Sequence, residues 1–216
     1  MLAVGNVEIR AIAISILVGG LLQLRLIWGR FDETIATLLL QHQTHELAET
    51  DSLTGLRNRR AFTQALEDDV KDRADNRRFA VAMLDLDGFK PINDTHGHYA
   101  GDKVLKITAQ RLREVLRHTD VAARIGGDEF ALILHGVQKR SDIDLALNKL
   151  LHTLSIPIDI DGRDVQVHAS AGVAIFPQDS RDMLALCRLA DGAMYAAKVD
   201  KNTFRYHSPF RPAESI

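Results

Sequence analysis

Gly126-Gly127-Asp128-Glu129-Phe130 joins two short apolar runs, Val121–Ile125 and Phe130–Leu134. Two strand-length runs separated by paired glycines predict a β-hairpin, because glycine accepts the positive φ angles of tight turns. Adjacent carboxylates repel each other and are poor strand formers, so folding alone gives little reason for Asp128 and Glu129. A divalent cation that holds an anionic substrate would give a reason, since hard cations take oxygen ligands. The alternative is a solvated turn that is acidic.

A second acidic group favours the metal site. The apolar run Phe79–Leu84 predicts a strand buried on both faces, and Asp85-Leu86-Asp87 follows it. Carboxylates at the C-terminal end of a buried strand lie where open α/β sheets bind ligands. Because Leu86 separates them, Asp85 and Asp87 would face the same side of a regular strand. A buried aspartate without a partner is costly, so a cation is the better explanation.

The stretch Pro91–Asp102 is polar, is broken by proline and glycine, and precedes the helical pattern of Lys103–Leu116. Within it, Asn93 and Asp102 offer an amide and a carboxylate, the donor and acceptor set that reads a guanine edge. Just before it, Lys90 offers a point charge for phosphate. Each of these residues alone would be an ordinary loop residue.

Four ordered blocks between Glu49 and Phe204 together resemble the GGDEF family of diguanylate cyclases. They are Asp51–Phe62, which resembles D-x-L-T-G-L-x-N-R-R-x-F; Asp85–Asp102, which resembles D-x-D-x-F-K-x-I-N-D-x-x-G-H-x-x-G-D; Arg124–Phe130, which resembles R-x-G-G-D-E-F; and Ala190–Lys198, which resembles A-D-x-A-M-Y-x-A-K.

The resemblance implies a fold and a reaction. The fold is α+β, a palm-like central mixed sheet flanked by helices, here with an N-terminal helical extension. In the reaction, two GTP molecules, one on each of two facing domains of a homodimer, condense to cyclic di-GMP and two pyrophosphates. Each 3′-hydroxyl attacks the opposite α-phosphate, with two Mg²⁺ or Mn²⁺ ions in each active site. A catalytically silent receptor for GTP or cyclic di-GMP, or a different nucleotidyl cyclase, is the alternative.

The resemblance also implies residue roles. The metal ligands would be the carboxylates of Asp85, Asp128 and Glu129 and the backbone carbonyl of Leu86. Asp128 would help deprotonate the 3′-hydroxyl, and Glu129 would act with it in catalysis. The substrate-binding positions would be Asn93 and Asp102 at the guanine, His98 in the substrate loop, and Phe89. Lys90, Lys198 and Lys201 would lie at the phosphates, and Gly126 and Gly127 where the α-phosphate approaches the backbone.

Two details of the pattern leave alternatives open. The family often runs A-K-x-x-G-R-N after its last helix, whereas Lys198–Asn202 is one residue shorter and lacks the glycine, so the role of Lys201 is open. Arg117 and Asp120 match the family's R-x-x-D product-inhibition site, and an arginine near an aspartate suits a guanine base and a phosphate. The alternative is an arginine favoured by the helix dipole beside an aspartate that begins a strand.

Composition excludes several other classes. A net charge of −2 argues against a nucleic-acid partner held by a basic face. The nine histidines show no zinc-ligand spacing, and Cys187 lies among leucines as an apolar filler. With one cysteine there is no intrachain disulfide, as in a reducing compartment, so we expect a cytoplasmic catalytic domain.

The residue pattern also predicts elements and boundaries. Asp179 or Ser180 is expected to cap the last helix. Helices are predicted at 58–74, 101–117, 141–154 and 181–199, strands at 79–84 and 165–174, and a hairpin at 121–135. The predicted domains are an apolar segment at 1–30, a linker or signalling helix at 31–50, the GGDEF domain at 51–206 and a tail at 207–216.

The N-terminal segment has three explanations. Ala11–Trp28 is apolar, but only 14 uncharged residues separate Arg10 from Arg25, which is short for a membrane span of about 20. If Arg25 snorkels to the interface, the segment lengthens to roughly 18 residues and could anchor the protein in the bacterial inner membrane. A dimer-contact helix or the remnant of a sensor are the alternatives. Heptad spacing then continues through Phe31, Ile35, Leu38, His42 and His45, where a single amphipathic helix is the alternative to a dimerising one.

Overall fold

The computed structural model describes residues 49–72 and 78–207, together with Gly19, Gly20, Gln23 and Arg25. Met1–Ala48 and Glu49–Ile216 are separate units, and the second contains all the helices and strands named here. The predictions of a membrane segment at 11–28, a linker or signalling helix at 31–50 and a tail at 207–216 lie almost wholly outside the described residues. Within the described part of the chain, no helix is long and apolar enough to cross a membrane.

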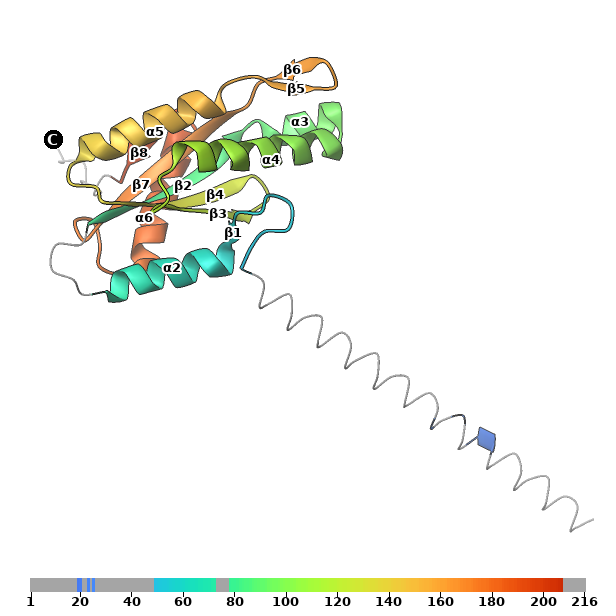
Figure 1. Ribbon diagram of the computed structural model, residues 1–216, viewed down its shortest axis with the longest axis horizontal. Coiled ribbons are helices and arrows are strands. Elements are labelled where there is room, and N and C mark those ends of the chain that lie inside the picture. Colours follow the sequence, from blue (N-terminus) through green and yellow to red (C-terminus); the bar gives the residue numbers. More distant parts are fainter. Residues whose placement is uncertain (1–18, 21–22, 24, 26–48, 73–77, 208–216) are drawn as a thin grey trace, which may run out of the picture. The chain divides into compact units, whose positions relative to one another are not determined.

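A six-stranded mixed sheet forms the centre of the domain (Figure 1). The central strand β2 pairs antiparallel with β4 on one side and with β7 on the other, while β1–β3 and β7–β8 are parallel pairs. This architecture confirms the predicted α+β class with a central mixed sheet. In spatial order the strands are β1 (Arg57–Asn58), β3 (Val121–Gly126), β4 (Glu129–His135), β2 (Phe79–Asp87), β7 (His168–Phe176) and β8 (Phe204–Tyr206).

Helices cover both faces of the sheet, and alternate residues of β2 pack against each layer. Ala80, Ala82 and Leu84 belong to the core cluster that includes α4 and α5, whereas Phe79 and Val81 belong to the cluster that includes α2 and α6. Figure 1 shows α4 and α5 over one face and α2 over the other. The helices are α2 (Arg59–Lys71), α3 (Phe89–His96), α4 (His98–Val115), α5 (Arg140–Leu154) and α6 (Met183–Ala197).

Several elements differ from the prediction. The stretch after β2 contains a helix, α3, which was not predicted. Pro91 does not break it, because it lies in the first turn, where a missing N–H costs nothing. The predicted strand at 165–174 is β7, which begins at His168, and a small hairpin precedes it. That hairpin is β5 (Ile158–Ile160) and β6 (Arg163–Val165).

The predicted cap of the last helix was wrong. Asp182 caps α6, since its carboxylate accepts a hydrogen bond from the Ala185 N–H at 2.7 Å. Asp179 instead accepts from the Ile175 N–H at 2.7 Å, and the Ser180 hydroxyl accepts from the Asp182 N–H at 3.0 Å. Both predicted residues therefore shape the loop before the helix.

Close backbone contact holds α6 on the sheet. A Cβ atom at Gly172 of β7 would lie 2.0 Å from the Ala190 carbonyl oxygen and 2.0 Å from the Met194 nitrogen. Only glycine allows this approach. Because α6 ends at Ala197, this contact also sets the position of Lys198 relative to the end of β2.

Candidate active site

The acidic residues of the two motifs come together where β2 ends. The β2–β4 register places Asp85 directly opposite Glu129. The Leu86 N–H donates a hydrogen bond to the Asp128 backbone oxygen at 3.3 Å. Asp85 is 7% exposed. Segments more than forty positions apart in the sequence thus bring the four predicted metal-site residues to one edge of the sheet.

The charges in this group act on each other. Burial raises the pKa of the Asp85 carboxyl, and the negative charges of Asp128 and Glu129 raise it further. The hydrogen bond and positive charge of Lys198 act in the opposite direction without cancelling the increase. Asp85 is therefore a buried carboxylate in a negative surrounding, and any cation that binds there lowers the cost of its charge.

Lys198 lies on Asp85, with its Nζ 2.7 Å from Asp85 Oδ2. Burial lowers the pKa of Lys198, but the bond to Asp85 and the charges of Asp128 and Asp87 outweigh burial and raise it. The ammonium group is thus charged at neutral pH. Lys198 was predicted to bind phosphate. In the structure it contacts an oxygen of the expected metal ligand Asp85, so a divalent cation would compete with it there.

The hairpin turn is fixed by an arginine that the sequence analysis did not single out. Gly126 ends β3 opposite Glu129, with a φ angle of 157°, and Gly127, with a φ angle of 53°, forms the turn together with Asp128. Arg124 donates to the Gly127 carbonyl oxygen from Nε at 3.0 Å and from Nη2 at 2.8 Å. Its Nη1 donates to both oxygens of Asp51, at 3.2 and 3.3 Å. The first and third motifs are therefore joined through Arg124.

The hydrogen bonds of the Asp87 carboxylate go to β7 and to the loop after α6. Its carboxylate accepts hydrogen bonds from the Ser170 hydroxyl and from the Asn202 backbone N–H. Lys198 and Asn202 both follow α6, so Asp85 and Asp87 reach the same side of β2, as the strand alternation predicts.

The predicted guanine-binding residues lie on the two helices that follow β2. Asn93 is on α3 and Asp102 is on α4, and Asp102 is exposed. A Cβ atom at Gly101 would lie 1.9 Å from Asn93 Oδ1 and 3.2 Å from the Phe89 ring, so glycine here leaves room for the Asn93 side chain. Phe89 begins α3 and is mostly buried, while Lys90 and His98 are exposed at the starts of α3 and α4. Because α3 begins two residues after β2 ends, these side chains follow directly from the acidic edge.

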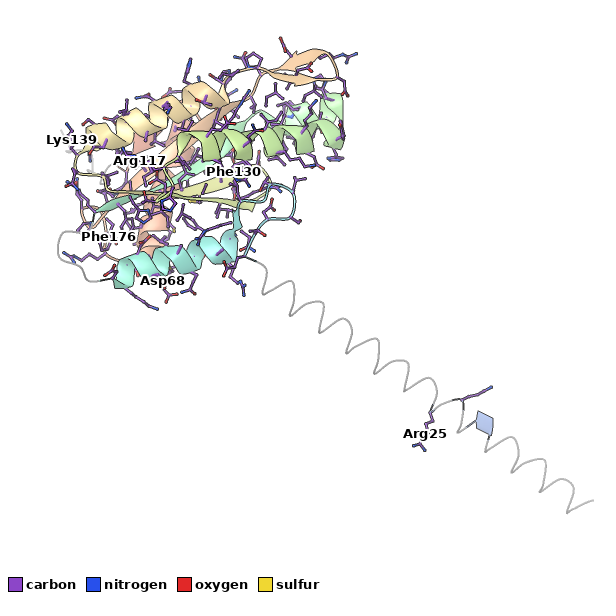
Figure 2. All side chains as sticks on the ribbon, viewed as in Figure 1. Arg25, Asp68, Arg117, Phe130, Lys139 and Phe176 are labelled. Atoms are coloured by element: carbon purple, nitrogen blue, oxygen red, sulfur yellow. The ribbon has the colours of Figure 1, made fainter. Side chains whose placement is uncertain are left out.

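The R-x-x-D residues line a hollow of about 540 Å³ beyond the end of α4, where Arg117 is labelled in Figure 2. Asp120 already has partners: it accepts from the Arg117 backbone N–H at 2.9 Å and from the His135 N–H at 3.0 Å. Arg113 lines the same hollow and donates to the Thr54 carbonyl oxygen at 2.7 Å. The hollow is therefore rich in arginine and open to an anionic ligand.

The donor set fits a hard divalent cation. The described residues contain no group of three or more His, Cys, Asp or Glu side chains arranged to hold a metal. Carboxylate oxygens beside a backbone carbonyl are nevertheless the ligands that Mg²⁺ takes, usually with water and substrate phosphates completing its shell. Asp85, buried beside two further carboxylates, suits that chemistry.

Residues 48–203 match the family described as diguanylate cyclase, GGDEF domain. The chain therefore belongs to the GGDEF family. It is 42% identical over 154 residues to the bifunctional diguanylate cyclase/cyclic di-GMP phosphodiesterase MucR of Pseudomonas aeruginosa, covering 71% of this chain and 22% of MucR. It is 40% identical over 158 residues to the cyclic di-GMP phosphodiesterase PdeR of Escherichia coli K12, covering 73% of this chain and 24% of PdeR. The chain thus spans about a quarter of these relatives.

Solved structures agree with the fold. The GGDEF domain of TpbB (YfiN) from P. aeruginosa matches with a TM-score of 0.71 and 37% identity, covering 74% of this chain and 94% of that domain. The GGDEF domain of DgcB from Caulobacter crescentus, solved in complex with cyclic di-GMP, matches with a TM-score of 0.68 and 31% identity, covering 74% and 96% of the two chains.

Proposed function

We propose that this protein is a diguanylate cyclase that condenses two GTP molecules into cyclic di-GMP and two pyrophosphates. The supporting observation is the meeting of Asp85, Leu86, Asp128 and Glu129 at one edge of the sheet. Folding gives no reason to gather three carboxylates there, and a cation-bound triphosphate does.

The residues divide the work of the reaction. Asp85, Asp128, Glu129 and the Leu86 carbonyl hold Mg²⁺ or Mn²⁺, two ions in each active site of the productive dimer. These ions supply stabilisation of the attacking and leaving oxygens during in-line displacement. Asp128 accepts the proton of the 3′-hydroxyl. The guanine-reading residues are Asn93 and Asp102 with Phe89 and His98 beside them, and the phosphate-binding residues are Lys90, Lys198, Lys201 and the backbone of Gly126 and Gly127.

The reaction requires two copies of the domain. Each copy presents one GTP, and each 3′-hydroxyl attacks the α-phosphate held by the partner. We therefore propose a homodimer as the catalytic unit, in the cytoplasm, with residues 11–28 as a membrane anchor or a dimer contact.

Product inhibition is a further part of the proposal. Arg117 and Asp120 line the arginine-rich hollow beyond α4. Cyclic di-GMP carries two phosphodiesters and two guanines, which suit arginine and aspartate side chains respectively. The structure of DgcB with cyclic di-GMP supports binding of this product by a related domain.

A catalytically silent receptor is the second candidate. The similarity to proteins named as phosphodiesterases supports it. The presence of all the signature carboxylates favours the enzyme. Purified full-length protein with GTP and Mg²⁺, with products separated by chromatography, distinguishes the two. Cyclic di-GMP should form, and Asp128→Ala should reduce its rate at least about 100-fold. Nucleotide binding without turnover would support the receptor instead.

A further inference from the structure

Of the two aspartates in Asp85-Leu86-Asp87, the proposed reaction uses Asp85 and does not use Asp87. Its two carboxylate oxygens accept the Ser170 hydroxyl at 2.9 and 3.0 Å, and Oδ2 also accepts the Asn202 backbone N–H at 3.0 Å. Ser170 is fully buried in β7. The carboxylate is therefore anchored to the sheet on one side and holds a loop backbone on the other.

The loop that it holds has an unfavourable backbone conformation. Asn202, whose N–H donates to Asp87, has a φ angle of 46°, and the preceding residue Lys201 has a φ angle of 55°. Left-handed conformations are sparsely populated by residues other than glycine, and such residues persist where the surrounding structure holds them. Asparagine tolerates this conformation, but lysine has no local compensation for it. A charged acceptor on the Asn202 N–H supplies the required restraint.

Other contacts fix the two ends of the same turn. The Lys201 N–H donates to the Ala197 carbonyl oxygen at 3.1 Å, and the Ala171 N–H donates to the Thr203 carbonyl oxygen at 2.9 Å. Asp87 therefore restrains the middle of a turn that is tied to α6 at its start and to β7 at its end.

The turn carries both lysines assigned to the phosphates. Lys198 begins it, with its ammonium on Asp85, and Lys201 lies in its middle with an exposed side chain. Asp85 and Asp87, two residues apart on β2, thus hold the same turn, one through a side chain and the other through the main chain.

We propose that Asp87 is a positioning residue for the triphosphate: it holds Lys201 and Asn202, at the end of the Lys198–Asn202 turn, in the left-handed conformation that presents Lys201 to the phosphates, and it is not a metal ligand. This proposal rests on the GTP-binding function proposed above. It also explains how a turn without glycine keeps the conformation that glycine would adopt freely.

The first measurement is amide hydrogen exchange of the full-length protein. Asp87→Ala should accelerate exchange at Asn202 while the amides of β2 and β7 keep their protection. Asp87→Asn keeps the size of the side chain and one acceptor oxygen, so it should fold even if the alanine variant does not, and should accelerate exchange less. Unchanged exchange at Asn202 in both variants would show that Asp87 does not restrain the turn. This readout does not depend on GTP binding, so it remains informative if the proposed function fails.

The second measurement is the affinity for a non-reacting GTP analogue, GDP and guanosine in the presence of Mg²⁺. Asp87→Ala should bind the triphosphate about tenfold more weakly and guanosine as the wild type does. Asp87→Asn should lie between, and Lys201→Ala should add little to Asp87→Ala, because both act through one group. Asp200→Asn is the matched control: it removes an equal charge from the turn that Asp87 holds and weakens the contact of Asp200 with Arg205, but it keeps the bond from Asp87 to the Asn202 N–H, so all three affinities should stay unchanged.

Three results would overturn the proposal. An equal loss for guanosine and triphosphate would indicate general structural damage. Full additivity of Asp87→Ala and Lys201→Ala would show that Asp87 does not act through Lys201. Loss of Mn²⁺ binding in Asp87→Asn, measured by electron paramagnetic resonance without nucleotide, would make Asp87 a metal ligand. If the wild-type protein binds no GTP analogue, it is the proposed function that fails.

Discussion

At the scale of single residues, Asp51 and Arg124 set the shape of the hairpin turn. Asp51 accepts hydrogen bonds from the Thr54 N–H at 2.8 Å and from its hydroxyl at 2.6 Å, and it binds Arg124. Arg124 in turn holds the Gly127 carbonyl oxygen. The backbone beside Asp128 is therefore held from the segment that opens the domain.

Asp51 gives the protein an acid-sensitive contribution to stability. Burial raises its pKa, but the hydrogen bonds from Thr54 and Arg124 outweigh burial and lower the pKa. As pH falls below about 4, the Asp51 carboxyl is protonated in the unfolded chain before it is protonated in the folded one. The stability that Asp51 contributes is therefore present above that pH and is lost as pH falls through the lower pKa of the folded state. We expect the difference in unfolding free energy between the wild type and Asp51→Asn, from urea denaturation, to shrink between pH about 6 and about 3. A constant difference would contradict the assignment.

Gly101 should affect the proposed binding of guanine by Asn93, with little effect on stability. In Gly101→Ala the new Cβ would displace the Asn93 side chain, which is a flexible group, while the backbone can stay in place. We expect KM for GTP to rise about tenfold with a small change in kcat and in melting temperature. Asn93→Ala should have the same effect, and the double variant should be no worse than either. Additive losses would show that Gly101 does not act through Asn93.

At the scale of elements, the packing of α6 on β7 places the turn that we propose to bind phosphate. The helix approaches Gly172 at backbone distance, and the turn that follows it is held by Asp85 and Asp87 at the end of β2. A displacement of α6 would therefore move Lys198 away from the acidic group.

Gly172→Ala should test this packing. The added Cβ meets rigid backbone atoms of α6, so the helix must shift, and we expect the free energy of unfolding to fall by about 2–3 kcal/mol. Gly192→Ala is the matched control, because Gly192 lies in α6 with no atom near its Cβ position, and it should stabilise slightly. Equal stability of Gly172→Ala and the wild type in urea denaturation would show that α6 is not held by this contact.

The sequence predicted the elements with strong patterns and missed the short ones. The continuous apolar run of β2 and the paired glycines of the hairpin were sufficient signals. The eight-residue helix α3 and the three-residue strands β5, β6 and β8 are too short to show a period. The last helix was predicted to begin at 181, with Asp179 or Ser180 as its cap; the contacts of the folded loop place the cap at Asp182 instead.

The candidate site shows the same division. Asp85, Asp128 and Glu129 were predictable because they violate the rules of strand formation, which points to function. The contacts of Arg124 with Asp51 and of Asp87 with Asn202 were not, because each joins segments 73 or 115 positions apart in sequence. Neither residue type nor local spacing carries that information.

At the scale of the whole molecule, the proposed reaction depends on assembly and on its own product. Two domains must meet with one GTP each, so the rate per protein should fall on dilution as the dimer dissociates. Arg117 lies in a separate hollow, which would allow the product to act on a domain whose active site is free.

Arg117→Ala should relieve inhibition by added cyclic di-GMP. Loss of charge-assisted hydrogen bonds to phosphate should raise the inhibition constant for cyclic di-GMP at least about tenfold. The initial rate without product should be retained. Lys149→Ala, which removes an exposed positive charge from α5, is the control and should be inhibited like the wild type. Undiminished inhibition of Arg117→Ala would assign the hollow to another role.

A crystal structure of the protein with Mn²⁺ and a non-reacting GTP analogue, with anomalous data to locate the metal, would decide whether the acidic edge is the catalytic centre. We expect Mn²⁺ within about 2.3 Å of oxygens of Asp85 and Asp128, with Lys198 released from Asp85 to the phosphates. A nucleotide bound elsewhere, or a Mn²⁺ ion that leaves both carboxylates without metal contact, would contradict the proposed reaction.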